Sequence, residues 1–266
     1  MPSEVETSLD VSGSRRSQRL LDFARNDRGE DTTQYLFSSL DVYQDVFPRS
    51  AAMNMAIDEA LLDYVAVPSV RFYHWHSPAL SFGYFGKFID VMPYERGRDL
   101  VRRWTGGGIV LHGADLTYSI VIPESDAAFG ESSTSIYEKV HRALVAVLNE
   151  IGEHAVVAGG VDPGAIAAGM RTAVNASAYS CFANPVRADV MIDGCKVAGA
   201  AQRRTRRGLL QQGSIQRVDF GNGLAAGFAQ ALTTNRSERK INEQVLDRAR
   251  ELAHGKYGSD AWLRRR

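Results

Sequence analysis

The sequence predicts an α+β fold in which mixed or antiparallel sheets are flanked by helices. Short alternating or apolar runs, typical of strands, stand between segments with apolar residues at helical spacing. These runs do not alternate strictly with helices, as a doubly wound parallel fold would require. The chain has 266 residues, of which 44% are hydrophobic, and 31 basic side chains balance 31 acidic ones. It can therefore form a sizeable core, and its charge argues against a dedicated nucleic-acid-binding protein.

The first 34 residues differ in character from the rest of the chain. They are polar, charged and without periodicity, so we expect 1–34 to be a disordered N-terminal tail and 35–266 to form a single domain. No apolar stretch is long enough to span a membrane, and the N-terminus lacks the apolar core of a secretory signal. These observations favour a cytoplasmic protein that acts neither on membranes nor on nucleic acid.

Two helices and four strands are predicted in the first part of this domain. Ser50 is expected to cap a helix over "AAMNMAIDEALLDYV", whose apolar face carries Met53, Ile57, Ala60, Leu61 and Tyr64. Strand-like runs follow at 70–76, 100–104, 109–112 and 116–122. The segment "STSIYEKVHRALVAVLNEIG" predicts a long amphipathic helix, capped by Ser133 or Thr134 and ended by Gly152.

The second part begins with an irregular stretch and continues with a hairpin. Residues 159–180 are rich in Gly and Ala without a period, which indicates a loop. The pair Asp193-Gly194 between two apolar runs predicts a tight hairpin turn. Alternation along the second strand places Lys196, Ala198 and Ala200 on one face, and Cys195, Val197 and Gly199 on the other. A strand at "LLQQGSI" and helices near 223–233 and 238–255 complete the chain.

Three successive glycines are the first candidate site. Gly106, Gly107 and Gly108 lie between two predicted strands, after a pair of arginines and before His112. Bare backbone lets a ligand approach its N–H groups closely, although a simple tight turn is the alternative. No Lys-Ser or Lys-Thr follows, so the block is not a phosphate-binding loop of the Walker type.

Cys181 and Lys196 are the second candidate site. A nearby cation lowers the pKa of a thiol and so raises the fraction of the nucleophilic thiolate. If Lys196 faces a site, the neighbouring Cys195 points away from it, which makes Cys181 the better nucleophile; a buried packing role for Cys181 is the alternative. His74 and His76 could be half of a metal site, but no third ligand is evident, so no metal is predicted.

Five ordered blocks resemble the lipoate branch of the biotin/lipoate protein ligase superfamily. They are "MNMAIDEALL" (53–62), "RFYHWHSPALSFGYF" (71–85), "RRWTGGGIVLH" (102–112), "GCKVAGAAQRR" (194–204) and "KYGSDAW" (256–262). The resemblance implies the catalytic-domain fold of that superfamily, with Cys181 and Lys196 as catalytic residues. The substrate-binding residues that it implies are Gly83, Arg103, Gly106, Gly107, Gly108, His112 and Gly199.

The block "CFANP", which begins at Cys181, resembles the octanoyltransferases of this branch. Such enzymes move octanoate from acyl carrier protein, through a cysteine thioester, to a lysine. The resemblance therefore implies a cofactor-free octanoyltransferase of lipoate biosynthesis. Its partners would be octanoyl-acyl carrier protein and a lipoyl-carrier protein, either the glycine cleavage H protein or a dehydrogenase E2 lipoyl domain. The acyl chain is expected to lie against the glycine block.

Other readings remain open at this point. The triple glycine is closer to the form found in ATP-dependent lipoate–protein ligases, which would need ATP and Mg²⁺, and Gln212 stands where both relatives usually have histidine. A non-catalytic module that binds carrier proteins is a remoter alternative, and a biotin ligase fits the blocks less well. Both expected partners are typically acidic, so a turn with four arginines could be a docking rim or merely a solvated turn: Arg203, Arg204, Arg206 and Arg207.

Overall fold

The computed structural model describes residues 35–159, 185–221 and 223–265. The expected tail at 1–34, nearly all of the expected loop at 159–180 and the candidate nucleophile Cys181 lie outside the described residues.

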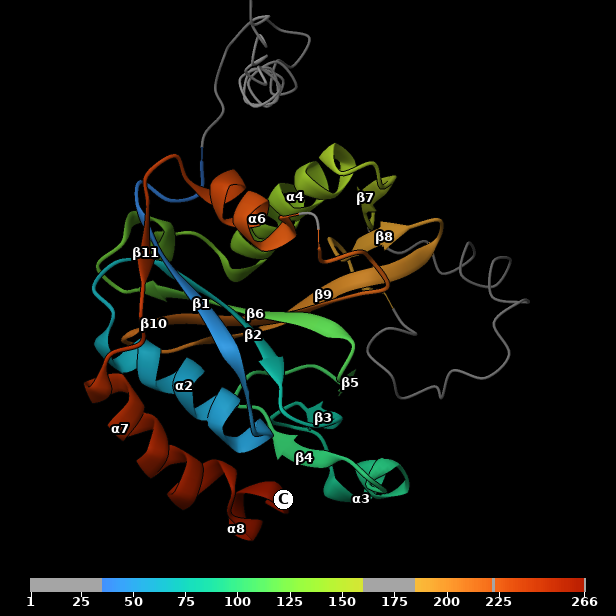
Figure 1. Ribbon diagram of the computed structural model, residues 1–266, viewed down its shortest axis with the longest axis vertical. Coiled ribbons are helices and arrows are strands. Elements are labelled where there is room, and N and C mark those ends of the chain that lie inside the picture. Colours follow the sequence, from blue (N-terminus) through green and yellow to red (C-terminus); the bar gives the residue numbers. More distant parts are fainter. Residues whose placement is uncertain (1–34, 160–184, 222, 266) are drawn as a thin grey trace, which may run out of the picture. The chain divides into compact units, whose positions relative to one another are not determined.

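Two mixed sheets form the framework of the described domain (Figure 1). In the eight-stranded sheet the pairs β11–β1 and β1–β2 are parallel and all others are antiparallel. Its strands are, in spatial order, β11 (Arg236–Arg239), β1 (Leu40–Arg49), β2 (Ser69–Trp75), β6 (Asp115–Pro123), β10 (Gly208–Gln216), β9 (Cys195–Arg204), β8 (Val190–Ile192) and β7 (Ala155–Val157). The three-stranded sheet has the order β4 (Asp99–Arg102), β3 (Ala79–Phe82) and β5 (Ile109–His112).

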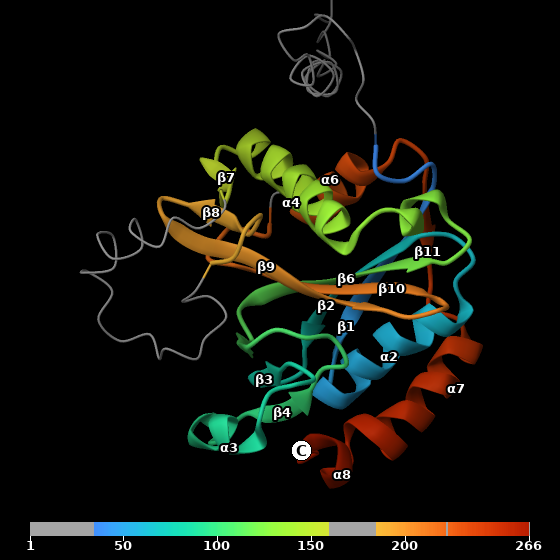
Figure 2. The same cartoon turned by 180° about the vertical axis from the view of Figure 1, so that it is seen from behind.

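Helices cover both faces of the large sheet, which confirms the predicted α+β class. Figures 1 and 2 show α4 (Ser133–Glu150) and α6 (Leu224–Leu232) on one face, with α2 (Ala51–Tyr64) and α7 (Glu243–Leu252) on the other. Each face encloses its own apolar cluster, one centred on α4 and α6 and one on α2 and α7. No helix in the described ranges is both long and apolar enough to cross a membrane.

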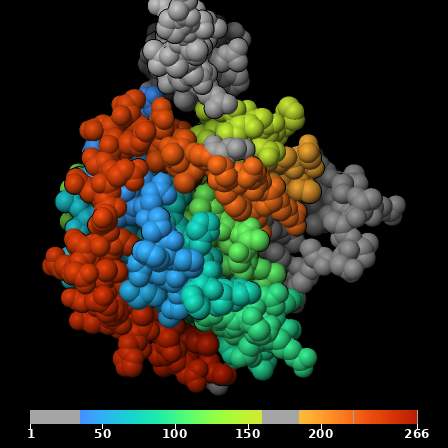
Figure 3. Space-filling view, in the orientation of Figure 1, coloured from blue at the N-terminus to red at the C-terminus, as the bar shows by residue number. Residues whose placement is uncertain are grey.

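Short helical segments complete the fold. They are α3 (Phe88–Val91), the 3-10 turns Met92–Tyr94 and Ala127–Gly130, the π-helical turn Ala253–Tyr257 and α8 (Asp260–Leu263). In Figure 3 the C-terminal residues, coloured red, lie at the surface beside the blue residues of β1. The C-terminal segment therefore contributes to the surface near the start of the domain.

The helix caps follow the sequence with small corrections. Ser50 caps α2 as predicted, its Oγ accepting from Met53 N at 3.3 Å. Burial on α2 is broader than one stripe because the sheet and α7 cover two of its sides; Met53 is only half-buried and Tyr64 is 42% exposed. The cap of α4 is Ser132, one residue before the predicted one, and its Oγ accepts from Ser135 N at 3.1 Å.

Four strands escaped prediction, each for a physical reason; β7 has only three residues, too few to show an alternation. β11 has four exposed residues and no apolar one, so no alternation marks it. β3 is buried on both faces and has only four residues, and β1 loses its alternation after its first half. Because β11 takes Arg236–Arg239, the last long helix begins at Glu243 rather than near 238, with Asn242 as its cap.

A buried ion cluster fastens α2 to the large sheet. The Arg71 guanidinium is fully buried and lies 2.8 Å from the carboxylates of both Asp58 and Asp45. It also donates to Asn54 Oδ1 at 2.7 Å. Burial alone would lower the pKa of Arg71, but the two carboxylates raise it, so the guanidinium stays charged. A buried charge is tolerated only when it is paired and hydrogen-bonded in this way.

Replacing Arg71 should therefore be costly. In Arg71→Ala, Asp58 and Asp45 would remain buried without their cation, and we expect the free energy of unfolding to fall by about 3–5 kcal/mol. Equilibrium urea unfolding measures this change. The control is Arg239→Ala, which removes a half-exposed pair with Asp41 and should cost at most about 1 kcal/mol. Equal losses in the two variants would show that the buried cluster is not a special source of stability.

Candidate active site

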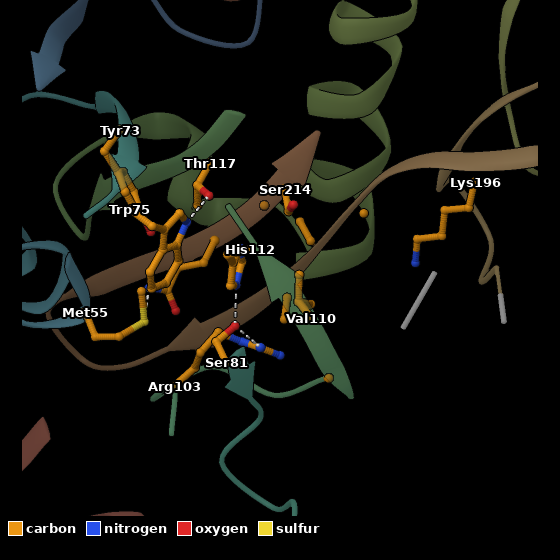
Figure 4. Close-up of a pocket in the computed structure, with 16 residues that line it drawn as sticks. Met55, Tyr73, Trp75, Ser81, Arg103, Val110, His112, Thr117, Lys196 and Ser214 are labelled. Atoms are coloured by element: carbon orange, nitrogen blue, oxygen red, sulfur yellow. Dashed lines mark hydrogen bonds between the residues drawn. The ribbon is translucent and has the colours of Figure 1, made fainter. Parts of the chain in front are cut away.

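A pocket lies where residues of the two sheets and the glycine block meet (Figure 4). Together with the open solvent at its mouth, it spans about 470 Å³ of space that no protein atom fills. Its lining residues are Met55, Tyr73, Trp75, Ser81, Arg103, Gly107, Val110, His112, Thr117, Lys196, Gly199, Ala200, Ala201, Gln212, Gly213 and Ser214. Small and apolar side chains dominate this lining, so the pocket suits an apolar ligand with a polar end.

The glycine block packs against β3 at a distance that only glycine allows. A Cβ on Gly83 would lie 2.1 Å from the carbonyl oxygen of Gly107 and 2.7 Å from that of Gly106. Gly107 has φ +86°, a left-handed conformation that favours glycine, and it lines the pocket. Gly83 is thus required for the close approach, and Gly107 presents bare backbone to the pocket.

Arg103 holds the glycine block in place. Its Nη2 donates to the carbonyl oxygens of Gly106 at 3.0 Å and Gly108 at 2.9 Å, on either side of Gly107. Its Nη1 donates to Ser81 Oγ at 2.7 Å on β3. The structure therefore makes Arg103 a clamp between β3 and the loop, while Gly106 and Gly108 serve as its acceptors.

A hydrogen-bonded row continues from Arg103 into the pocket floor. Ser81 Oγ lies 2.7 Å from His112 Nε2, and His112 Nδ1 lies 2.8 Å from Asp115 Oδ2. Because Arg103 donates to Ser81, the hydroxyl proton is directed to Nε2, and the imidazole proton on Nδ1 is directed to Asp115. Burial lowers the pKa of His112, so the neutral imidazole is favoured at pH 7. Trp75 stacks on this ring with centroids 4.0 Å apart.

Asp115 is the end point of this row. Its Oδ2 also accepts from Thr117 Oγ1 at 2.8 Å and from Ser214 Oγ at 2.7 Å. Burial would raise the pKa of Asp115, but the hydrogen bonds from His112 and Ser214 lower it below its usual value. The order serine–histidine–aspartate resembles that of serine hydrolases. Ser81, however, is fully buried and engaged on both sides, so it positions the histidine rather than offering an open nucleophile.

Gln212 connects the pocket to the buried ion cluster. Its Nε2 donates to Asp58 Oδ2 at 2.7 Å, and its Oε1 accepts from Thr105 Oγ1 at 2.8 Å. Thr105 directly precedes the glycine block. The amide therefore fixes the loop to α2 with one donor and one acceptor.

Lys196 forms the second polar group of the pocket. Its Nζ lies 2.7 Å from Asp189 Oδ2, and both side chains are almost wholly buried. Tyr137 donates to the other carboxylate oxygen at 2.5 Å and accepts from Ala200 N at 3.1 Å, which ties the pair to α4 and β9. Figure 4 shows Lys196 apart from Ser81 and His112, so the two polar groups occupy different parts of the lining.

A β-bulge overturns the predicted alternation around Lys196. Val190 pairs with Ala198 while Met191 pairs with Lys196, so Val197 is an extra residue on β9. The bulge reverses the faces: a Cβ on Gly199 would lie 2.4 Å from Lys196 Cε, and both residues line the pocket. The Asp193-Gly194 turn just before it has φ values of +48° and +74°, as predicted for a tight hairpin.

A buried histidine supports the segment that carries Asp189. His141 Nδ1 is 2.6 Å from the carbonyl oxygen of Ala188, and its Nε2 is 3.1 Å from Tyr118 Oη. Burial lowers the pKa of His141 to about 4, so the ring is neutral and links α4 to the entry of β8. Ala188 has φ +67°, a strained value that this contact helps to hold.

The other candidate residues lie elsewhere. Cys195 is exposed, and His74 and His76 are exposed as well; among the residues with described positions, no group of three His, Cys, Asp or Glu could hold a metal. Arg204 donates to the carbonyl oxygens of Phe129 and Glu131, and Arg207 pairs with Asp63. Two of the four arginines of the predicted docking rim are thus engaged within the domain.

Sequence reasoning missed the residues that position the site. They are Asp58, Ser81, Asp115, Tyr137 and Asp189. A signal existed for two of them. Asp58 follows Asn54 by four residues and so lies on the same face of a helix otherwise rich in apolar residues, and Asp115 precedes a wholly buried strand. An acidic residue in such a place requires buried partners.

Comparisons with known proteins identify the family of the chain. The chain matches the family of the lipoyl protein ligase A/B catalytic domain over residues 50–252. Octanoyltransferase LipM of Kyrpidia tusciae is 40% identical, over 62% of this chain and 62% of that protein's length. LipM of Staphylococcus epidermidis is 30% identical over 80% of this chain and 94% of its own. The structure of protein Ta0514 from T. acidophilum with bound lipoic acid is 25% identical, with a TM-score of 0.62, over 85% of this chain and 98% of that chain.

A methyl group on Gly83 tests the packing of the glycine block. In Gly83→Ala the new Cβ would displace the Gly107 carbonyl, so we expect a loss of about 1–3 kcal/mol in the free energy of unfolding. Equilibrium urea unfolding measures this loss. Gly130→Ala, where a Cβ would meet nothing within 4 Å, is the matched control. An unchanged Gly83→Ala protein would mean that the loop can retreat freely.

The pH dependence of stability tests the neutral His141. Its folded-state pKa of about 4 lies below the ordinary value of 6.5, so protonation favours the unfolded chain. The free energy of unfolding should therefore fall as the pH drops from about 6.5 toward 4, by up to about 1.4 kcal/mol per pH unit from this residue.

Urea unfolding at a series of pH values measures this slope. His141→Gln should show a shallower fall, whereas the exposed control His154→Gln should keep the wild-type slope. The lowered pKa of His112 contributes equally in all three proteins. Identical slopes for His141→Gln and the wild type would contradict the buried, neutral assignment.

Proposed function

Because the chain belongs to the lipoyl protein ligase A/B catalytic-domain family, we propose that it is an octanoyltransferase of lipoate biosynthesis. Its donor is octanoyl-acyl carrier protein, and its acceptor is the lysine of a lipoyl-carrier protein, either the glycine cleavage H protein or a dehydrogenase E2 lipoyl domain. The octanoyltransferases among its relatives support this assignment. The match to the first of them spans less than two thirds of that protein's length.

The observation that carries the proposal is an apolar pocket that contains one buried lysine. Gly107 offers bare backbone on one side, and small residues of β9, Gly199, Ala200 and Ala201, form another wall. The polar groups of the floor are satisfied by one another, from Arg103 to Asp115. A saturated acyl chain can therefore enter without leaving a buried donor or acceptor unpaired.

Lys196 supplies the positive charge for the chemistry. Asp189 holds its ammonium group at 2.7 Å, which fixes its position in the wall of the pocket. Charge develops on the carbonyl oxygen of the acyl group when a nucleophile adds to it, and a positioned donor stabilises that oxyanion by about 3 kcal/mol. The same cation would favour the thiolate form of a nearby cysteine.

The reaction has two acyl-transfer steps. The Cys181 thiolate adds to the carbonyl carbon of the octanoyl thioester; the bond to the carrier sulfur then breaks, and the carrier thiol leaves after taking up a proton. The neutral amine of the acceptor lysine next adds to the carbonyl carbon of the acyl-enzyme; the bond to Cys181 sulfur breaks, the thiolate leaves, and the attacking nitrogen gives up one proton to solvent, which leaves a neutral amide. His112 is engaged at both nitrogens, so it shapes the pocket instead of exchanging protons with the substrate.

No ATP is needed for this route because a thioester is already an activated acyl group. A free carboxylate would first have to be converted to an acyl-adenylate. The requirement for ATP therefore separates the transferase from a lipoate–protein ligase that shares the fold.

The mass of the intact protein tests the acyl-enzyme directly. After mixing with octanoyl-acyl carrier protein and no ATP, the wild type should gain one octanoyl group, because the Cys181 thioester accumulates without an acceptor. Cys181→Ser should show no adduct, and the control Cys195→Ser, at an exposed position, should keep it. Addition of a lipoyl domain should discharge the adduct.

Either of two other results would contradict the proposed octanoyltransferase activity. Acylation of the lipoyl domain only with ATP and free acid would mean a ligase, with Cys181 a packing residue. Binding of carrier protein without transfer from any donor would mean a non-catalytic module.

A further inference from the structure

The face of β9 that lines the pocket continues beyond it to Arg203. Gly199 and Ala201 line the pocket, and alternation places Arg203 on the same face. Register agrees with this, because Gln212, another lining residue, lies opposite Ala201, and Leu210 lies opposite Arg203. Four residues of strand separate Gly199 from Arg203, which corresponds to about 13 Å. A ligand that extends from the pocket along β9 therefore reaches the Arg203 side chain.

Arg203 belongs to a group of cations and aromatic rings that we call the cation–aromatic cluster. The Arg203 guanidinium lies 5.1 Å from the ring centroids of Tyr84 and Trp104. The Lys256 ammonium lies 4.6 Å from Trp104 and 4.4 Å from Trp262. The members of the cluster are Tyr84, Trp104, Arg203, Lys256, Trp262 and Arg265. All six are half-buried, so none of them is wholly enclosed by the protein.

Arg102 assembles this cluster from distant parts of the chain. Its buried guanidinium donates to the carbonyl oxygens of Tyr84 at 2.9 Å and of Leu263 and Arg265, both at 2.9 Å. Trp262 Nε1 donates in return to the Arg102 carbonyl oxygen at 2.9 Å. The C-terminal segment is thereby fixed next to β4 and Tyr84. A surface depression lined by Lys256, Trp262 and Arg265 lies within the segment so held.

Among residues 35–159, 185–221 and 223–265, the cluster carries more positive charge than its ion-pair partners neutralise. Glu59 accepts from Lys256 Nζ at 2.6 Å, which offsets one of three cations. The Arg203 side chain forms no hydrogen bond or ion pair with any residue whose position is described, and its Nε is buried without a partner. Burial, and then the charge of Arg203, lower the pKa of Lys256 although Glu59 opposes this. An anion placed among these cations would relieve their repulsion.

We propose that the cation–aromatic cluster binds the phosphate group of the acyl donor. The proposal rests on the proposed function, because the thioester of an acyl carrier protein hangs from a pantetheine arm that a phosphate joins to the protein. With the thioester carbonyl at Lys196 and the octanoyl chain directed toward Trp75 and His112, the arm runs along β9 past Gly199 and Ala201 and brings its phosphate to Arg203. A guanidinium recognises phosphate through two parallel hydrogen bonds, and Lys256 and Arg265 add charge on the other side.

Kinetics with two small donors test this site. We compare octanoyl-phosphopantetheine with octanoyl-pantetheine, which differ only in the phosphate. The wild type should show a KM about tenfold lower for the phosphorylated donor. In Arg203→Gln the ratio of the two KM values should move toward one. Arg96→Gln removes an exposed cation outside the cluster and should keep the wild-type ratio.

Binding without turnover separates this proposal from the proposed function. Trp104 and Trp262 belong to the cluster, so their fluorescence should respond to phosphopantetheine at about tenfold lower concentration than to pantetheine. Equal affinity for the two compounds overturns the phosphate site even if acyl transfer occurs. Tight binding of phosphopantetheine without any acyl transfer would support the site while the proposed function fails.

A parallel binding experiment identifies the kind of molecule that supplies the phosphate. An acyl-adenylate also carries a phosphate next to its acyl group, so octanoyl-AMP is titrated in parallel. If Arg203→Gln weakens only the binding of octanoyl-AMP and leaves that of phosphopantetheine unchanged, the phosphate belongs to a nucleotide and the proposal is wrong.

Discussion

The buried carboxylate of Asp58 is the interaction on which the rest of the structure depends. It accepts hydrogen bonds from side chains of β2, β6 and β10, namely Arg71, Tyr73, Ser119 and Gln212. A buried carboxylate is tolerated only when such donors are in place. The register of β2, β6 and β10 and the position of α2 on the sheet are therefore fixed together. Gln212, which donates to Asp58, also accepts from Thr105, the residue before the glycine block. The position of the glycine block therefore depends on the buried carboxylate of the core.

Hydrogen-bonded polar residues hold the walls of the pocket in place, while small and apolar residues make up most of its lining. Arg103 donates hydrogen bonds to the carbonyl oxygens of the glycine block and to Ser81. The row of hydrogen bonds continues through His112 and ends at the ionised Asp115. Each group in this row has a partner within the protein, so water is not needed to satisfy it. Such an arrangement holds a flexible acyl chain against rigid walls. Lys196, which Asp189 and Tyr137 orient, then meets the reacting carbonyl rather than the chain.

Charge is distributed along β9 in a way that fits a long donor. Lys196 lies at one end of the pocket-lining face and the cation–aromatic cluster lies beyond its other end. Between them stand Gly199 and Ala201, whose small side chains leave the strand surface open. The arm that carries the acyl group can thus lie along this strand, from a thioester at Lys196 to the cluster. The net charge of the whole chain is zero, so these cations act through their position and not through a general basic field.

Local sequence determined those features that neighbouring residues control: the Ser50 cap, the Asp193-Gly194 turn, the amphipathic α4 and the glycine block. Tertiary structure alone decided how distant segments meet. The bulge at Val197 placed Lys196 and Gly199 on one face, against the alternation that the sequence predicts. Exposed β11 became a strand because β1 offers it a partner, and Arg102 holds the C-terminal segment beside Tyr84 through hydrogen bonds to the carbonyl oxygens of Tyr84 and Arg265. Turn and cap preferences act over a few residues, whereas register and buried pairing depend on what packs across the fold.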